Sequence, residues 1–318
     1  MAVSLDQLQA FVAAAEAGSF SGAARALRKA QSAVSMQVAN LEADLGLDLF
    51  SRAGRNPVLT PAGERLLLEA RVVLDRREHL IGVARSLEQR VEHRLVVAID
   101  ELYPEHALGA LFAEFARAFP HVELELLFPL MEDVSRMVQS GAADLGVMWR
   151  QEVLPTELGF QTIGWVPLKL VCGRDHPLAK GSLDKPRVEW EELKRHRQIL
   201  VAARSDGPEK RRLRVAAEVW WVESHWVILE MVKHGIGWAF VTDHVIAASL
   251  TAPYLVTPDL QFDQGDWPIA LELVWHKQRP CGPAAAWLRE RFAAERVGGL
   301  SGDERAADFR RPSPFPDD

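Results

Sequence analysis

The chain has 318 residues, 48% of them hydrophobic and 25% charged, which is typical of a folded protein of two or three domains and excludes a fibrous or disordered one. A formal net charge of −7 excludes a molecule that is basic over its whole surface. The charge is uneven, because residues 1–90 hold 11 Lys and Arg against 10 Asp and Glu, whereas residues 91–318 hold 26 against 34. A nucleic-acid contact confined to the N-terminal part is compatible with this distribution.

The N-terminus has no basic segment, and Leu5, Leu8 and Phe11 recur at helical spacing, so an amphipathic helix is expected rather than a signal peptide. No stretch approaches the roughly 18 apolar residues of a membrane span. Cys172 and Cys281 follow no pattern, which favours buried thiols in a reducing compartment. We therefore expect a cytoplasmic protein with no membrane partner.

Two short helices joined at Lys29–Gln31 are predicted next. Ser21 is expected to cap the first, GAARALR, and Gly46 to end the second, SAVSMQVANLEADLG. Small residues allow a close approach of the two helices, as in a helix-turn-helix, although two packed helices of an unrelated α-domain remain an alternative. The expected apolar face of the second helix is Val34, Val38, Leu41 and Leu45.

A hairpin and a long helix are predicted to follow. Residues 49–60, LFSRAGRNPVLT, read as a β-hairpin wing that carries Arg52 and Arg55. These arginines suit phosphates or a narrow minor groove, although a solvated side chain is the commoner role. Residues 60–90 form one helix, which either pairs with a second chain or packs on its own body. Its heptad seam is Leu66, Ala70, Val73, Arg77, Leu80, Ala84 and Leu87.

The run from Leu5 to about Leu87 resembles the winged helix-turn-helix and linker helix of LysR-type transcriptional regulators. AFVAAAEAGSFSGAARAL, QSAVSMQVANLEADLGLDLFSR and LTPAGERLL carry the resemblance. Two departures are Ser32, where a proline is common, and Met36, where Arg or Gln is frequent. Met36 can touch a thymine methyl but donates no hydrogen bond. The DNA-binding residues that the resemblance implies are Gln31, Ser32, Ser35, Met36, Arg52 and Arg55.

Beyond residue 91 strands and helices alternate, which predicts βαβ units and a mostly parallel sheet. AEFARAFPHVELEL, VQSGAADLGV, LVCGRDHPLA and VKHGIGWAFV resemble the effector-binding half of the same family, built like type 2 periplasmic binding proteins. The predicted fold is therefore a multidomain α+β and α/β protein. Its parts are a winged helix-turn-helix domain (1–60), a linker helix that dimerises (61–90), an effector-binding region (91–296) and a disordered tail (297–318). The region divides into subdomain I (about 91–165 plus 267–296) and subdomain II (about 166–266), with the chain crossing near 165 and 266.

Ligands of such folds bind at the carboxyl ends of strands. Family members often place a Ser or Thr hydroxyl after the first strand to hold a carboxylate, but this chain has Asp100 and Glu101 there. We therefore expect a neutral or cationic effector, or one held by Arg204; alternatively, the two acids only cap a helix. Trp226 is a further aromatic candidate. The effector-binding candidates are Glu101, Tyr103, Trp149, Arg204, Ser205, Ser224 and Thr242.

No GxSxG elbow, P-loop, HExxH or His/Cys cluster occurs in the sequence, so neither an enzyme, a cofactor nor a metal is expected. The prediction is a sequence-specific transcriptional regulator modulated by a small-molecule effector. The resemblance implies a nucleoid-associated homodimer paired through the linker helix, assembled into a tetramer on a pseudo-palindromic operator, and it allows a contact with RNA polymerase. One alternative is a small-molecule binding protein whose N-terminal helices serve only for oligomerisation. The other is an α/β enzyme.

Overall fold

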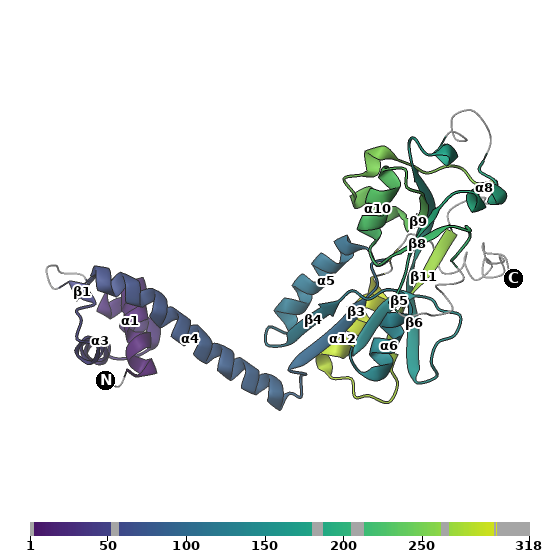
Figure 1. Ribbon diagram of the computed structural model, residues 1–318. Coiled ribbons are helices and arrows are strands. Elements are labelled where there is room, and N and C mark those ends of the chain that lie inside the picture. Colours follow the sequence, from purple (N-terminus) through teal and green to yellow (C-terminus); the bar gives the residue numbers. More distant parts are fainter. Residues whose placement is uncertain are drawn as a thin grey trace. The chain divides into compact units, whose positions relative to one another are not determined.

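The computed structural model describes residues 3–51, 57–179, 187–204, 213–261, 267–295 and 297. The chain divides into two compact units, Met1–Gln89 and Arg90–Asp318 (Figure 1). Each unit has its own hydrophobic core. Within the described ranges, no helix is both long enough and apolar enough to cross a bilayer.

The first unit contains four helices and a hairpin within its described part: α1 (Leu5–Ala17), α2 (Phe20–Leu27), α3 (Gln31–Leu45), β1 (Phe50–Ser51), β2 (Val58–Leu59) and α4 (Pro61–Glu88). The hairpin is antiparallel, as predicted. Its core joins Phe11 of α1, Ala23 of α2 and Leu41 of α3, all at most 1% exposed. The alanines of α2 thus allow the close helix packing that the sequence predicts.

The start of α2 differs from the prediction. Ser19, rather than Ser21, is the N-cap, and its hydroxyl accepts a hydrogen bond from the Gly22 N–H at 3.1 Å. Ser21 is an exposed residue inside the helix. Both serines precede helix-forming residues, so the local sequence alone does not decide which of them is the N-cap. The prediction for α3 is confirmed, since Gly46 ends it in a left-handed conformation at φ 69°.

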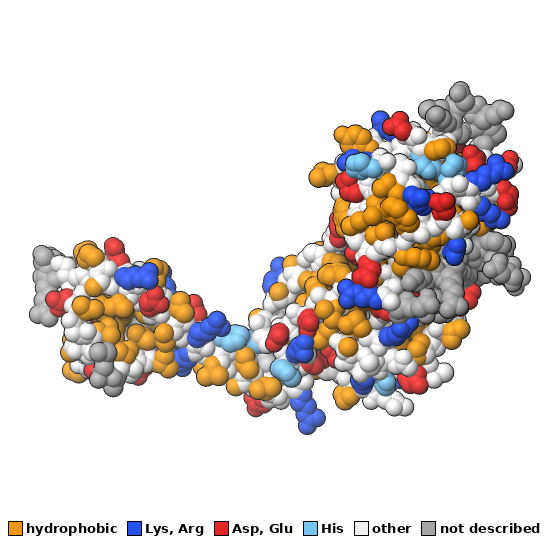
Figure 2. Space-filling view, viewed as in Figure 1, with side chains coloured by type: hydrophobic (Ala, Val, Ile, Leu, Met, Phe, Trp, Pro, Cys, Tyr) orange, Lys and Arg blue, Asp and Glu red, His pale blue; other side chains and the backbone are white. Residues whose placement is uncertain are grey.

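Helix α4 begins at Thr60, whose hydroxyl caps the Gly63 N–H, with Pro61 in the first turn. The heptad seam divides into two parts. Ala70 is buried in the core of the first unit, whereas Leu80 and Leu87 are 67% and 59% exposed. Figure 2 shows hydrophobic and charged side chains interspersed along α4. The later part of the seam is therefore unpartnered in a single chain.

The second unit is built on one mixed sheet whose described strands follow the order β4-β3-β5-β11-β6-β9-β7-β8, with β10 beside β6. The strands are β3 (Arg94–Ile99), β4 (Glu123–Leu127), β5 (Leu145–Trp149), β6 (Leu158–Gly173), β7 (Gln198–Val201), β8 (Val219–Val222), β9 (Trp238–Thr242), β10 (Leu255–Val256) and β11 (Trp267–His276). β3 pairs in parallel with β4 and β5, and β7 in parallel with β8 and β9. Each parallel group is the sheet of one subdomain.

Helices cover this sheet and connect its strands (Figure 1). They are α5 (Glu105–Ala118), α6 (Glu132–Ser140), α8 (Trp190–Lys194), α10 (His225–Lys233), α11 (Asp243–Ala248), the short 3-10 helix η1 (Ala252–Tyr254) and α12 (Pro283–Ala294). α6 packs on β5 and β11, α10 on β7 and β9, and α12 on β6 and β11.

The strands β6 and β11 join the two subdomains. They are antiparallel from Leu158 opposite His276 to Leu168 opposite Trp267, with a shift of register between Leu271 and Glu272. The sequence predicts a strand only from residue 167, but β6 begins nine residues earlier. Residues 158–166 contain two glycines and no apolar alternation, and pairing with β11 makes them a strand.

Candidate functional site

The predicted DNA-reading residues of α3 share one exposed face. Gln31, Ser32, Ser35 and Met36 are all exposed, and Met36 is 63% exposed. Val34 and Val38 on the opposite face are at most 2% exposed. The burial of one face therefore fixes which side chains α3 presents to a partner.

The N-terminus of α3 is open. Its N-cap is Ala30, which offers no side-chain hydrogen bond, so the first amides of the helix have no side-chain cap. Such amides carry the positive end of the helix dipole and favour phosphate. Arg52 and Arg55, the predicted wing contacts, lie outside the described residues.

In the second unit the carboxylate of Asp100 links the loop after β3 to the loop before α6. It is 2% exposed, Oδ1 accepts the Leu102 N–H at 2.9 Å, and Oδ2 accepts the Met131 N–H at 2.7 Å. Burial raises the pKa of this carboxyl, against the effect of the two hydrogen bonds. Both oxygens are thus engaged by backbone, but Asp100 does not cap the helix that follows, because the N-cap of α5 is Pro104 and receives no side-chain hydrogen bond.

Glu101 connects the two subdomains. Its Oε2 accepts the His225 N–H at 3.1 Å and lies 3.0 Å from Nδ1 of the His225 ring, which is 2% exposed. Burial acts to raise the pKa of Glu101, but the hydrogen bonds and charge of His225 outweigh it and hold the pKa below its ordinary value. His225 is the first residue of α10, so a carboxylate of subdomain I satisfies the start of a helix in subdomain II.

His244 makes a second connection at the same loop. Its ring bonds the Glu101 backbone, and Thr242 Oγ1 lies 3.4 Å from its Nε2. Burial lowers the pKa of His244 to about 4, and the neighbouring His225 and His106 act in the same direction. The ring is therefore neutral near pH 7. Thr242, a predicted effector contact, is fully buried and holds His244.

The remaining effector candidates are dispersed. Tyr103 and Trp149 are 2% and 8% exposed and belong to the core, where neither polar atom has a hydrogen-bond partner among the described residues. Arg204 is 84% exposed at its side chain and pairs with Glu223 of its own subdomain. Ser224 is the half-buried N-cap of α10, and the side chain of Trp226 is exposed beside it. Ser205 lies outside the described residues.

A third connection links the two subdomains. The backbone N–H of Arg204 donates to Oδ2 of Asp133, at the start of α6, at 3.0 Å. Side chains of both subdomains also share one core, in which Leu102 and Met131 meet Leu200. Apolar side chains of both subdomains thus take part in one core next to these polar connections.

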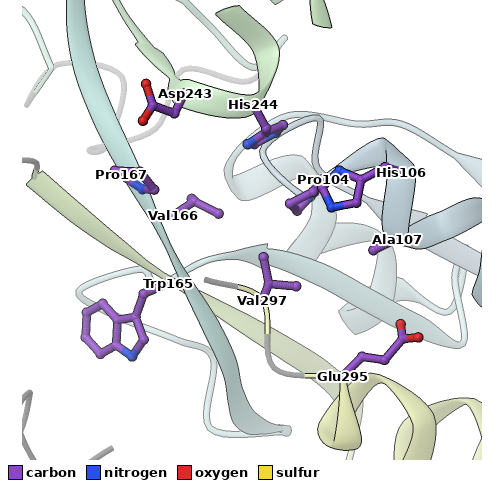
Figure 3. A pocket seen from close by; sticks show the side chains of 10 residues that line it. All are labelled: Pro104, His106, Ala107, Trp165, Val166, Pro167, Asp243, His244, Glu295 and Val297. Atoms are coloured by element: carbon purple, nitrogen blue, oxygen red, sulfur yellow. The ribbon is translucent and has the colours of Figure 1, made fainter. Parts of the chain in front are cut away.

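A pocket of about 400 Å³ does remain, at the hinge. Its walls come from the start of α5, the middle of β6, the start of α11 and the end of α12 (Figure 3). Two of its lining residues, Pro104 and Asp243, directly follow the effector-binding candidates Tyr103 and Thr242. The lining residues are Pro104, His106, Ala107, Trp165, Val166, Pro167, Asp243, His244, Glu295 and Val297.

Most of these lining residues are absent from the sequence-based candidates. Trp165 to Pro167 belong to a strand that the sequence predicts only from 167, and Glu295 follows α12 more than a hundred residues later. Only the crossing of β6 beside α5 and α11 brings them together. No group of three or more His, Cys, Asp or Glu among the described residues is placed to hold a metal ion.

A helix-turn-helix unit with an exposed second helix, followed by a two-subdomain α/β unit with a hinge pocket, defines a DNA-binding regulator that responds to a small molecule. Two family models match the chain: the bacterial regulatory helix-turn-helix protein of the lysR family over residues 5–64, and the LysR substrate binding domain over residues 88–296. The chain belongs to the LysR family of transcriptional regulators.

Similar proteins agree with this assignment. The HTH-type transcriptional regulator AceR of Acinetobacter baumannii is 31% identical over 93% of this chain and 99% of its own length. The RuBisCO operon transcriptional regulator of Allochromatium vinosum is 29% identical over 93% of this chain and 97% of its own. Full-length BenM, at 19% identity and a TM-score of 0.50, covers 98% of this chain and 99% of its own. An OxyR mutant of Corynebacterium glutamicum has 23% sequence identity and a TM-score of 0.50, and the match covers 93% of this chain and 92% of the OxyR chain. These two structures share the fold.

Proposed function

We propose that this regulator reads its operator with Gln31, Ser32, Ser35 and Met36 of α3, and that Arg52 and Arg55 of the wing contact the DNA backbone or minor groove. The exposed face of α3 is the observation that carries this proposal. Small polar side chains let the helix approach base edges closely, and the uncapped start of α3 suits a phosphate.

The regulator acts as a homodimer paired through α4, and two dimers form a tetramer on a pseudo-palindromic site. Leu80 and Leu87 support the pairing, because they are exposed at heptad spacing. Two identical recognition helices related by a two-fold axis read two half-sites. An effector held between the subdomains favours one arrangement of the second unit and so changes how the DNA-binding units meet DNA and RNA polymerase.

The experiment is capture of fragmented genomic DNA by the purified protein at about 150 mM salt, followed by sequencing. We expect a few pseudo-palindromic sites to be enriched. Arg52→Ala with Arg55→Ala should weaken their capture and flatten the salt dependence. Even coverage of the genome by the wild-type protein would refute sequence-specific reading.

A matched pair of variants tests the assignment of the α3 face. Ser35→Asp places a negative charge on that face and should weaken binding to a captured site about tenfold or more. Asn40→Asp adds the same charge to an exposed position later in the same helix and should have a much smaller effect. Equal losses of DNA affinity in the two variants would show that the proposed residues are not the DNA contacts.

A further inference from the structure

The hinge pocket is a site in the described part of the second unit where a ligand would touch both subdomains. Pro104 and His106 reach it from subdomain I, and Asp243 and His244 from subdomain II. Val166 and Val297 form apolar walls between them (Figure 3). A volume of about 400 Å³ lies within the range of small-molecule sites.

The charged side chains around this pocket favour a cationic ligand. Within the described part of the chain, neither Lys nor Arg is among its lining residues, which include two carboxylates, Asp243 and Glu295. Asp243 is neutralised by Lys169 at 2.8 Å, so Glu295 remains as the lining carboxylate with no ion pair within the described part of the chain. Glu295 also follows the C-terminal end of α12, where the helix dipole favours a cation.

The two imidazoles of the pocket do not offset this preference. His244 is neutral near pH 7 and has its ring nitrogens engaged by the Glu101 backbone and Thr242. His106 is exposed at the start of α5, and when neutral it can accept a hydrogen bond from a ligand. An anion would thus meet few donors and an unpaired carboxylate.

A buried hydroxyl lies close to the same place. Tyr103 precedes Pro104 and packs edge-on against Phe292 of α12 at 5.6 Å. Its Oη is buried with no hydrogen-bond partner among the described residues. Burial raises the pKa of this phenol, and the negative charge of Glu295 adds to the effect.

We propose that the hinge pocket is the effector site of this regulator and that it takes a small organic amine, protonated at neutral pH, with an apolar body. The ammonium group faces Glu295, and the apolar body lies against Val166, Val297 and Pro104. The ligand bridges the subdomains beside the Glu101 connection to His225 and His244, and so stabilises one hinge arrangement. The inference rests on the proposed function and names the ligand class that acts in it.

The test uses the full-length protein and three probes of one shape, 2-phenylethylamine, 2-phenylethanol and phenylacetate, titrated by calorimetry at pH 7.5. The amine should bind more tightly than the alcohol, and the acid most weakly. Glu295→Gln should weaken the amine about tenfold and leave the alcohol nearly unchanged. The control Glu290→Gln removes an exposed carboxylate of the same helix outside the pocket and should change neither.

A second pair of variants locates the apolar body. Ala107→Phe fills the pocket without changing its charge and should abolish binding of the amine and the alcohol. Ala110→Phe places the same ring at an exposed position of α5 outside the pocket and should leave both intact. Tighter binding of the acid, absence of amine binding up to millimolar concentration, or equal binding by Ala107→Phe and wild type would overturn the proposal.

DNA binding separates this inference from the proposed function. The amine should change the affinity of the wild-type protein for a captured operator, and it should not change that of Ala107→Phe. An operator that is bound while the amine has no effect on either protein refutes the effector assignment alone. If no operator is bound, the proposed function fails, whatever calorimetry shows at the pocket.

Discussion

At the scale of single residues, hydrogen bonds of buried polar groups link the two subdomains around the hinge. Glu101 is the clearest example, since one carboxylate oxygen serves both the N–H and the ring of His225. Because His225 is almost fully buried, removal of the acceptor leaves donors that water cannot reach. A residue that the sequence suggests as a ligand contact therefore joins the subdomains.

Glu101→Ala should lower the free energy of unfolding of the second unit by about 2 kcal/mol, because two buried donors lose their acceptor. Urea unfolding followed by tryptophan fluorescence measures this unit alone, since all ten tryptophans lie between residues 149 and 287. Glu290→Ala, at an exposed helical site, should change the same free energy by less than about 0.5 kcal/mol. A loss for Glu101→Ala no larger than that of the control would contradict the connecting role.

His176 makes stability depend on pH. It is 5% exposed, its Nδ1 accepts the Leu178 N–H at 3.3 Å, and burial with the nearby charge of His196 lowers its pKa to about 4. The unfolded chain, with a histidine pKa of about 6.5, takes up the proton first. The contribution of a neutral His176 to stability is thus fully present above about pH 6.5, and it is lost as the pH falls toward 4.

Between pH 7.5 and 4.5 His176→Asn should lose less stability than wild type, by about 2 kcal/mol, because asparagine supplies an acceptor for the Leu178 N–H and does not titrate. The measurement is urea unfolding followed by tryptophan fluorescence at the two pH values. His93→Asn replaces an exposed histidine of the same unit and should show the wild-type loss. Parallel behaviour of the two variants would show that His176 does not titrate in this way.

At the scale of elements, helix caps and strand pairing decide where the elements begin and end. Ser19 caps α2 although Ser21 is as good a candidate in sequence, and β6 begins at Leu158 because β11 pairs with it there. A cap depends on the backbone path that enters the helix, and a strand depends on its partner.

Ser19→Ala should destabilise the first unit by about 1 kcal/mol, through loss of the hydrogen bond to Gly22, and Ser21→Ala by less than about 0.5 kcal/mol. Hydrogen exchange of the amides of α1 to α3 in the full-length protein reports this unit separately from the second. Faster exchange in Ser21→Ala than in Ser19→Ala would restore Ser21 as the cap.

At the scale of the whole molecule, the exposed part of the α4 seam is the feature that a single chain leaves incomplete. Leu80→Asp should dissociate the proposed dimer by placing a charge where two chains meet, which sedimentation at micromolar concentration measures. Arg85→Asp lies about 140° around the helix from that position and should leave the mass unchanged. An unchanged mass for Leu80→Asp would exclude α4 as the main dimer contact.

The amino-acid sequence by itself determined the family, the order of the elements and the face of α3 that points outward. These properties depend on local periodicity, on Gly46, and on the apolar residues Val34, Val38 and Leu41, which have no alternative place to be buried. The tertiary structure decided the roles of Asp100, Glu101 and the hinge pocket. Met131 and His225, the partners of Asp100 and Glu101, are 31 and 124 positions away in the chain, and no local pattern encodes such contacts.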